Sequence, residues 1–389
     1  MARICLMTVA GERSGDVYGA RLAAALKDQL GGVEMFGCGG EAMRSAGVET
    51  TVDAHEFAMV GITEVISGLP RAYRAFRRLL AEADRRRPRL VVLIDSPSLN
   101  IRLAERLKKR GVTVVYFVSP QIWAWKRWRL GQLKNRIDKM LCIFDFEEEI
   151  YRKAGVEVEY VGHPLVDAVH ADLTREAFFQ RTGLDPDTPT IALLPGSRRI
   201  ELSFNLPAMI DAAARLAGKR AVQFTMAVAP TIDSAWLDGQ LGRLRAGGPT
   251  IRAVVGATYD VLRHADAAVV ASGTATVEAA LLQCPMVVVY RVAATTAFFA
   301  RFMVDVPFYS MVNLLARKPV VKELIQADFT GPRVAEEVEY LLDNPGARQE
   351  MKMELAAIRS HLGPGGAIQR AADAVARMLQ PSQVRVGAI

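Results

Sequence analysis

A stretch in the second half of the chain could bind a phosphate. "LLPGSRRIE" (193–201) places a glycine-containing turn directly after a buried apolar strand, and Ser197 and Arg198 follow the glycine. The turn would expose backbone N–H groups, while the hydroxyl and the guanidinium add donors that suit a phosphate. A purely structural role also stays open, in which Arg198 caps a helix or forms a surface ion pair.

A second stretch of the same half points to the same chemistry. In "VVASGTATVEAALL" (269–282) a strand ends, Ser272, Gly273 and Thr274 form a turn, and a helix begins. The free N–H groups at the start of a helix attract anions. Glu278, about one turn into this helix, could accept hydrogen bonds from ribose hydroxyls. An ordinary cap by Thr274 is the alternative. Together the two stretches favour a nucleotide diphosphate.

Several common signatures are missing from the sequence. No G-x-G-x-x-G opens the first helix, and no G-x-x-x-x-G-K-[ST] occurs, so dinucleotide and P-loop sites are disfavoured. The five histidines and four cysteines show no metal-ligand spacing, and no nucleophile–histidine arrangement is legible. We therefore expect no metal and no cofactor.

The first half offers a candidate general base. "LVVLIDSPSLN" (90–100) ends its strand on Asp95, and Ser96 with Pro97 resembles an N-cap followed by proline at the first helical position. Asp95 could merely shape the turn. It could also lie at the cleft as a general base, since no better placed competitor is visible.

The loop after the first strand is a candidate ligand-binding site. In "VAGERSGDVYGA" (9–20), Gly11 and Gly15 would let the backbone approach a ligand. The polar side chains beside them are Glu12, Ser14 and Asp16. Helix capping by Ser14 or Asp16 is the structural alternative.

The elements that must position these residues alternate between strands and helices. Short runs of Val, Ile and Leu that are apolar throughout suit central strands of parallel sheets, and amphipathic segments separate them. We expect an α/β fold with two Rossmann-like, doubly wound parallel sheets that face each other across a cleft. Ligands of such sheets bind at the carboxyl ends of the strands, where the candidate residues stand.

Polar turns place the domain boundaries. We predict an N-terminal Rossmann-like domain over 1–165, a linker over 166–188 and a C-terminal Rossmann-like domain over 189–345 that carries the two phosphate-binding stretches. The remainder, 346–389, is predicted as helices that pack back on the N-terminal domain.

Composition restricts the class of protein. The 389 residues are 51% hydrophobic and 23% charged, which is typical of a globular chain. No apolar run of membrane-spanning length lacks a charge, and the start does not resemble a signal peptide, so we expect a cytoplasmic protein. The net charge of +7 favours an anionic partner.

Two segments suggest where that partner binds. Residues 68–89 contain many arginines and an apolar helical face made of Leu69, Tyr73, Phe76, Leu79 and Leu80. "SPQIWAWKRWR" (119–129) carries three of the four tryptophans, and Trp128 stands among cations there. Both patterns suit an anionic lipid surface, although a core-facing stripe is the usual meaning of the first and core packing of the second. No nucleic-acid-binding module is visible, and we exclude nucleic acid.

The motifs as a set resemble the lipid-A-disaccharide synthases, glycosyltransferase family 19 of the GT-B architecture. The matching pieces, in order from residue 10 to about 291, are "AGERSGD", "MVGITEV", "IDSPSLN", "VSPQIWAW", "VGHPLVD", "LPGSRRIE", "SGTATVE" and "CPMVVVYR". One departure lies in "PFYSMVNLLARKP", where Val312 and Arg317 replace the proline and glycine of the family pattern beside Asn313.

The resemblance implies inverting transfer of 2,3-diacylglucosamine from UDP to 2,3-diacylglucosamine 1-phosphate, giving a β-1,6-linked disaccharide 1-phosphate and UDP. Asp95 would be the base. The resemblance places UDP on Ser197, Arg198, Ser272, Gly273, Thr274, Thr276, Glu278 and Asn313, and the sugar on Glu12, Ser14, Gly15 and Asp16. It also implies peripheral binding to the inner face of the cytoplasmic membrane and a homodimer.

Two other functions remain open at this point. A different UDP-sugar GT-B enzyme, such as a soluble glycosyltransferase or an epimerase, would share the phosphate motifs but need not share the tryptophan segment or the basic helix. A non-enzymatic lipid-binding protein would need neither Asp95 nor a UDP site.

Overall fold

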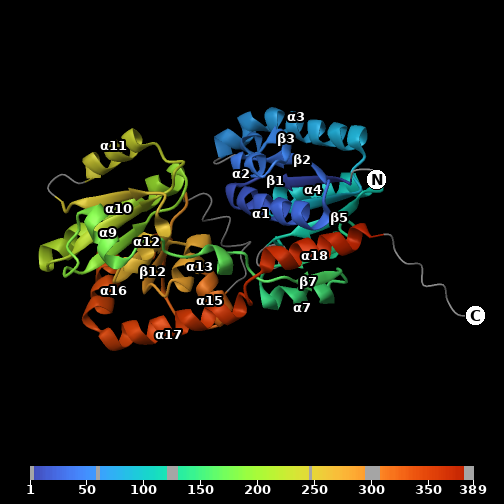
Figure 1. Ribbon diagram of the computed structural model, residues 1–389. Coiled ribbons are helices and arrows are strands. Elements are labelled where there is room, and N and C mark those ends of the chain that lie inside the picture. Colours follow the sequence, from blue (N-terminus) through green and yellow to red (C-terminus); the bar gives the residue numbers. More distant parts are fainter. Residues whose placement is uncertain (1–3, 58–61, 121–129, 245–247, 294–306, 381–389) are drawn as a thin grey trace, which may run out of the picture. The chain divides into compact units, whose positions relative to one another are not determined.

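The computed structural model describes residues 4–57, 62–120, 130–244, 248–293 and 307–380, with only the backbone of 62–68 (Figure 1). The chain divides into two compact units. Unit 1 comprises Met1–Pro164 together with Leu362–Ile389, and unit 2 comprises Leu165–His361. Each unit is built around one parallel sheet.

Unit 1 contains a seven-stranded sheet in the order β3-β2-β1-β4-β5-β6-β7, and every neighbouring pair is parallel. Its strands are β1 (Cys5–Ala10), β2 (Glu34–Gly39), β3 (Glu49–Asp53), β4 (Leu90–Ile94), β5 (Thr113–Phe117), β6 (Lys139–Cys142) and β7 (Val158–Tyr160). The order reverses direction beside β1 and β4, which is the switch point where doubly wound folds bind ligands.

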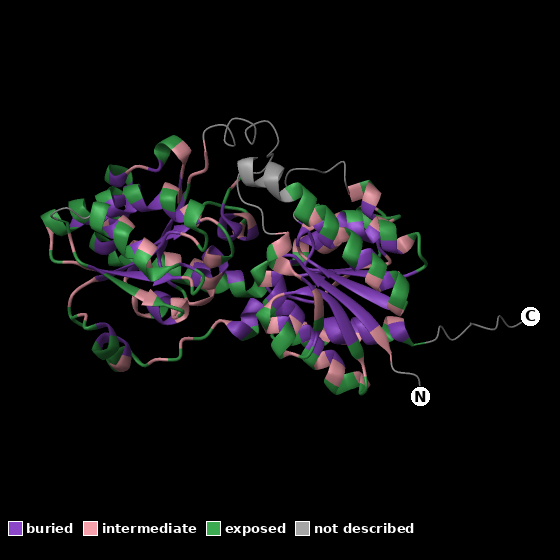
Figure 2. Ribbon diagram, turned by 90° about the horizontal axis from the view of Figure 1, so that it is seen from above, coloured by how far each residue is buried: buried purple, intermediate pink, exposed green. Residues whose placement is uncertain are grey.

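Helices cover both faces of this sheet, whose central strand β4 is buried throughout and whose strand β5 is buried from Val114 onward (Figure 2). They are α1 (Arg13–Leu30), α2 (Glu41–Ser45), α3 (Ile62–Arg86), α4 (Pro97–Lys108), α6 (Leu130–Leu133), α7 (Asp145–Lys153), α18 (Ala367–Leu379) and the 3-10 turn η1 (Ala54–Glu56). Val, Leu and Ile fill β4 without alternation because helices shield it from water on both sides.

The last helix, α18, belongs to unit 1 although the chain reaches it only after completing unit 2. It packs along α1, as Figure 1 shows, with Ala371, Val375 and Leu379 buried. Arg370 donates from Nε to the carbonyl of Val161 at 2.9 Å, and Arg377 pairs with Glu159 at 2.7 Å. The two ends of the chain therefore build one core.

Unit 2 contains a six-stranded sheet in the order β10-β9-β8-β11-β12-β13, again parallel throughout. Its strands are β8 (Thr190–Leu194), β9 (Gln223–Val228), β10 (Ile251–Val255), β11 (Ala267–Ala271), β12 (Met286–Tyr290) and β13 (Lys322–Ile325). The helical elements are α8 (Leu165–Ala168), α9 (Arg175–Thr182), α10 (Arg199–Lys219), α11 (Ser234–Leu244), α12 (Thr258–His264), α13 (Thr274–Leu281), α15 (Met311–Ala316), η3 (Gln326–Asp328), α16 (Gly331–Asp343) and α17 (Pro345–His361). The prediction of two doubly wound parallel-sheet units is confirmed.

The segment that we expected to be a linker forms part of unit 2. Its helix α9 buries Phe178 and Phe179, and the Phe178 ring lies 5.0 Å from the ring of His264 on α12. The buried Asp260 carboxylate accepts the N–H groups of Asp172 and Leu173, both at 2.8 Å. Unit 2 therefore begins at the start of α8 rather than at β8.

Within the described ranges no helix combines the length and the apolar character that crossing a membrane requires. The four cysteines are free thiols, three of them buried.

Candidate functional site

The turn after β8 already binds an anion, which the chain itself supplies. The Glu201 carboxylate accepts the N–H of Ser197 at 2.8 Å and that of Arg198 at 3.3 Å on Oε2, and Oε1 accepts from Nη1 of Arg198 at 3.3 Å. Gly196 has φ = +126°, and a Cβ there would lie 2.5 Å from Oε2 of Glu201. The turn thus has the donors that the sequence predicted.

Our sequence reasoning missed Glu201, although a signal for it was present. Glu201 stands at the third position of α10, three residues after Arg198, which is the spacing of a capping box. In that arrangement a carboxylate folds back onto the N–H groups at the helix start. Ser197 and Arg198 are exposed, so this turn lies at the surface of unit 2.

The turn after β11 has an exposed rim and a buried base. Gly273 and Thr274 are exposed, and Ser272 donates from Oγ to the carbonyl of Tyr309 at 2.9 Å. Thr276 is buried, and its hydroxyl donates to the carbonyl of Gly273 at 2.8 Å. This corrects the expectation for the Thr276 side chain, which shapes the turn from beneath.

Glu278 lies partly buried on α13 beside the start of α12. Its Oε1 accepts a hydrogen bond from the Tyr259 hydroxyl at 3.3 Å. Burial raises the pKa of Glu278, and the hydrogen bond from Tyr259 opposes that shift. Strands β8 and β11 are paired, so the turns at 196–198 and 272–274 share one carboxyl edge of the sheet.

Asn313 is not available as a UDP ligand, which corrects the expectation from the family pattern. It is 1% exposed, its Oδ1 accepts from Val320 and Val321, and its Nδ2 donates to Val321 and Glu323, all between 2.8 and 2.9 Å. An amide side chain has two donors and two acceptor sites, and all four are used. Asn313 therefore fastens α15 to the segment that enters β13.

In unit 1 the candidate base stands on an unusual backbone. Asp95 directly follows β4, is partly exposed, and has φ = 50°, and Ser96 has φ = 45°. Two consecutive non-glycine residues in the left-handed region cost roughly 1–2 kcal/mol each. Proline does take the first position of α4, as predicted, but the Ser96 side chain makes no cap hydrogen bond.

Two buried side chains hold the carbonyl of Asp95. The Tyr116 hydroxyl donates to it at 2.5 Å, and Nδ2 of Asn100 donates to it at 2.8 Å. The Asp95 N–H donates to the carbonyl of Phe117 at 3.0 Å. Burial, followed by the nearby charge of Asp95, raises the pKa of Tyr116 well above its usual range.

The loop after β1 runs beside Asp95, because Ala10 and Ile94 are paired across β1 and β4. Glu12 is exposed and Ser14 partly so, and the charge of Glu12 contributes to the raised pKa of Tyr116. Gly15 is buried, and a Cβ there would lie 3.3 Å from that of Ala10, so this glycine allows close packing of α1.

Asp16 has a structural role, which corrects its assignment to the sugar site. Its carboxylate accepts the N–H groups of Gly40 at 2.6 Å, Ala42 at 3.0 Å and Met43 at 3.1 Å. It thereby caps the start of α2 from a neighbouring helix, and only 7% of it is exposed. The sequence could not separate a cap from a ligand because the capped helix follows more than twenty residues later.

Helix α3 is only partly the apolar surface that we expected. Leu69 is 52% and Tyr73 62% exposed, whereas Leu79 and Leu80 are buried in the core of unit 1 and Phe76 is partly buried. The expectation for Leu79 and Leu80 was therefore wrong, because the stripe turns inward along the helix. Trp128 lies outside the described residues.

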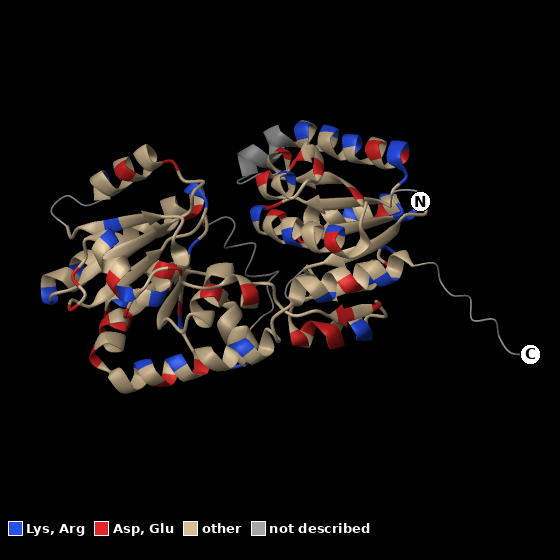
Figure 3. Cartoon of the chain, viewed as in Figure 1, with Lys and Arg blue, Asp and Glu red and all other residues tan. Residues whose placement is uncertain are grey.

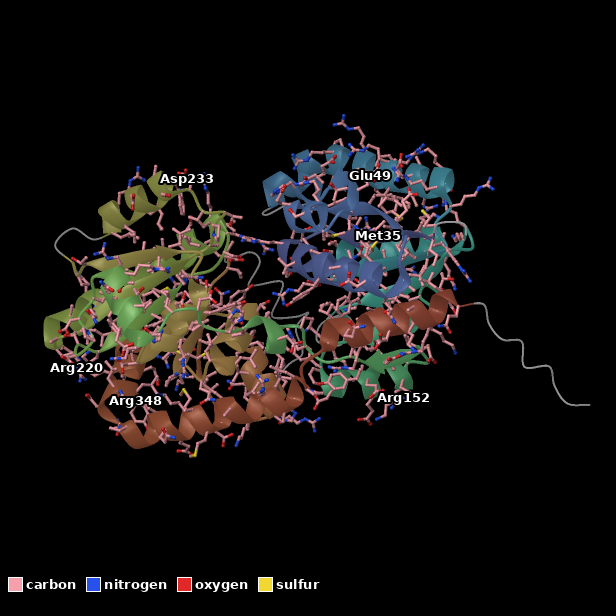
Figure 4. The ribbon with its side chains drawn as sticks, in the orientation of Figure 1. Met35, Glu49, Arg152, Arg220, Asp233 and Arg348 are labelled. Atoms are coloured by element: carbon pink, nitrogen blue, oxygen red, sulfur yellow. The ribbon has the colours of Figure 1, made fainter. Side chains whose placement is uncertain are left out.

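The arginines of α3 are also divided (Figure 3). Near the end of the helix Arg86 pairs with Glu34, Glu82 and Glu49, the last of which is labelled in Figure 4. Arg78 pairs with Glu56 at 2.9 Å. Much of the basic charge in the second half of α3 is therefore matched by acids of unit 1.

No group of three or more potential metal ligands occurs within the part of the chain that the structure describes.

Comparison with known proteins supplies the family context. The family model described as "Lipid-A-disaccharide synthetase" matches residues 6–375. A curated lipid-A-disaccharide synthase of Myxococcus xanthus is 45% identical over 380 residues, covering 97% of this chain and 98% of the relative.

Solved structures agree on the fold. A putative UDP-N-acetylglucosamine 2-epimerase from Listeria monocytogenes aligns with a TM-score of 0.66 at 15% identity, over 96% of each chain. The glycotransferase of kitacinnamycin aligns with a TM-score of 0.62 at 15% identity, over 98% of this chain and all of that one. At such identity these two similarities concern the fold alone.

Proposed function

The chain belongs to the lipid-A-disaccharide synthase family and is a glycosyltransferase of lipid A disaccharide synthesis, and on that premise we propose how its residues share the reaction. The enzyme uses a UDP-sugar. We assign 2,3-diacylglucosamine as the sugar transferred from UDP and 2,3-diacylglucosamine 1-phosphate as the acceptor.

Asp95 is the proposed general base. The acceptor 6-hydroxyl attacks C1 of the donor sugar, its proton passes to the Asp95 carboxylate, and the C1–O bond breaks with its electron pair leaving on UDP. Attack from the face opposite UDP inverts C1 and gives the β-1,6 linkage. The observation that carries this assignment is the position of Asp95, partly exposed at the carboxyl end of β4 on a backbone held by buried donors.

The proposed UDP site lies on unit 2. The N–H groups of Ser197 and Arg198 and the turn 272–274 offer donors along one sheet edge, where charge on the departing diphosphate can be stabilised. The Glu278 carboxylate accepts hydrogen bonds from the ribose hydroxyls. For the diphosphate to use the 196–198 turn, the Glu201 carboxylate must move aside.

The sugar site is proposed beside Asp95. Glu12 and Ser14 follow β1, the neighbour of β4, and Gly15 keeps α1 close to the sheet. Asp16 contributes indirectly, since it fixes α2 against α1.

Both substrates carry acyl chains, so we place the enzyme at the inner face of the cytoplasmic membrane. The exposed Leu69 and Tyr73, with Arg71 and Arg74 between and beside them, form a surface suited to anionic headgroups. Trp128 as a membrane contact and a homodimer remain predictions.

The test is UDP release from UDP-2,3-diacylglucosamine in detergent micelles, with and without the acceptor. We expect wild-type release to depend on acceptor and Asp95→Asn to lose at least 1,000-fold while still binding UDP. Asp28→Asn, which changes an exposed aspartate of unit 1, is the matched control. Acceptor-dependent release that survives in Asp95→Asn would remove Asp95 from its role. No release by wild type would overturn the substrate assignment.

A further inference from the structure

Two buried polar side chains are committed to a single backbone carbonyl next to the candidate base. Tyr116 on β5 and Asn100 on α4 are each 0% exposed, and both donate to the carbonyl of Asp95. Asn100 donates to Ile94 as well, at 3.0 Å. Donors from two separate elements therefore meet at the residue where β4 ends.

These donors bind the backbone where it has an unfavourable conformation. Asp95 and Ser96 both have positive φ, and Val118, at the end of the neighbouring β5, has φ = 62°. A β-branched residue in this region is a genuine outlier. Strained residues of this kind persist only where the surrounding structure over-determines them, and they cluster at active sites.

The surroundings are not arranged for maximum stability. Ser96 Oγ and Asn100 Oδ1 are buried without a hydrogen-bond partner among the described residues. A Cβ added to Gly11 would lie 2.9 Å from Ser96 Oγ, so the loop after β1 packs closely against the turn at Asp95 and Ser96. Buried polar atoms of this kind call for an explanation beyond folding.

We propose that Tyr116 and Asn100 are positioning residues, which fix the Asp95 carboxylate for proton transfer by holding the carbonyl of the same residue. This inference rests on the proposed role of Asp95. A general base must lie within hydrogen-bond reach of the hydroxyl that it deprotonates, and a displacement of 1 Å can cost about 100-fold in rate. Because the pKa of Tyr116 is raised, its hydroxyl stays protonated and keeps donating at neutral and mildly alkaline pH.

The decisive variant is Tyr116→Phe, which removes one hydroxyl and keeps the ring. Tyr151→Phe is the matched control, since Tyr151 is also fully buried in unit 1 and donates to a backbone carbonyl, that of Pro120, at 2.6 Å. Both variants lose one buried phenol–carbonyl hydrogen bond. We expect similar falls in melting temperature, whereas kcat falls 10- to 100-fold further in Tyr116→Phe than in Tyr151→Phe.

The split between kcat and KM separates positioning from a general structural effect. In Tyr116→Phe the KM values of both substrates should stay within threefold of wild type, and the acidic limb of the pH–kcat profile should keep its position, since the same carboxylate takes the proton. Asn100→Ala should lower kcat in the same way, and it replaces Tyr116→Phe if that variant does not fold.

The controls distinguish this inference from the base assignment. One outcome would overturn the positioning role and leave Asp95 as the base. In it, Asp95→Asn is inactive, while the kcat values of Tyr116→Phe and Asn100→Ala stay within threefold of that of Tyr151→Phe. If Asp95→Asn keeps its activity, both proposals fall together.

Discussion

The carboxylate of Glu201 lies 2.8 Å from the backbone nitrogen of Ser197, in the turn that the sequence marks for a phosphate. A side chain of the protein thus occupies donors that the substrate is proposed to use. The consequence is a competition between two anions for one set of N–H groups.

Glu201→Gln should therefore bind UDP more tightly. Two like charges about 5 Å apart near a protein surface repel by ~1 kcal/mol or more, so removing one should lower the Kd about fivefold or more. The amide oxygen of glutamine can still accept the Ser197 N–H and keep the turn formed. Isothermal titration with UDP measures the change, and Glu350→Gln, on an exposed part of α17, is the control. Weaker binding by Glu201→Gln would mean that the carboxylate maintains the turn instead of competing for it.

The Tyr259–Glu278 pair predicts a pH dependence of UDP binding. Burial raises the pKa of Glu278, and an ionised carboxylate is needed to accept ribose hydroxyls, so affinity should fall as the pH drops through this raised pKa. Tyr259→Phe removes a hydrogen bond that favours the charged form, and the fall should then begin at higher pH. Stability changes in the opposite sense, because a raised carboxyl pKa contributes stability at low pH that is lost as the pH rises through it.

Titrating UDP affinity between about pH 4.5 and pH 8 checks this prediction against the usual carboxyl pKa range. In Glu278→Gln the fall in UDP affinity at low pH should disappear. If UDP affinity falls at the same pH in Tyr259→Phe as in wild type, the hydrogen bond does not affect the ionisation of Glu278.

Arg317 marks a site where the chain can be stabilised. It ends α15 with φ = 54°, a backbone conformation that glycine adopts without strain, and the resembled family has glycine there. Arg317→Gly should raise the free energy of unfolding by ~1 kcal/mol, seen as a higher midpoint in urea. Lys352→Gly, at an exposed interior position of α17, should lose a similar amount. Equal losses in both variants would mean that Arg317 makes contacts worth more than the strain.

The exposed side chains of Leu69 and Tyr73 on α3 can be tested for membrane contact without disturbing the core. Tyr73→Glu and Leu69→Glu add charge to side chains that are already more than half exposed, so folding should be unchanged. We expect several-fold weaker sedimentation with vesicles of phosphatidylglycerol and phosphatidylethanolamine. Tyr340→Glu, on α16, replaces a tyrosine that is 54% exposed in unit 2 and should bind vesicles like wild type. Equal binding by all three variants would exclude this surface.

The sheets could be predicted from the sequence because their strands are buried on both sides. Runs such as Leu90–Ile94 are apolar at every position, a pattern typical of a parallel strand that is covered on both faces. The position of the motifs could be predicted as a consequence. Residues that directly follow parallel strands lie at the carboxyl edge of the sheet, where such folds bind ligands.

The partners of individual side chains could not be predicted in this way. Asp16 binds N–H groups of α2, and Asn313 binds the segment entering β13, and neither partner is specified by local spacing. The helical pattern places Leu79 and Leu80 on the same face as Leu69 and Tyr73, but only Leu79 and Leu80 are buried in the core of unit 1. Such differences depend on tertiary packing, which periodicity does not encode.

The placement of α18 has a consequence for how the chain is made. Unit 2 is one continuous segment, Leu165–His361, and all of its strands have left the ribosome before α18 is synthesised. Unit 1 begins first, yet α1 keeps an uncovered apolar face until Ala367–Leu379 emerges. Domains usually fold in the order of synthesis, but here unit 2 is complete before unit 1, whose sheet is made first and whose last helix is made after unit 2. The unit that carries the candidate base is thus the last to be completed, so a ribosome that stops at residue 361 releases a finished unit 2 and a unit 1 that lacks its last helix.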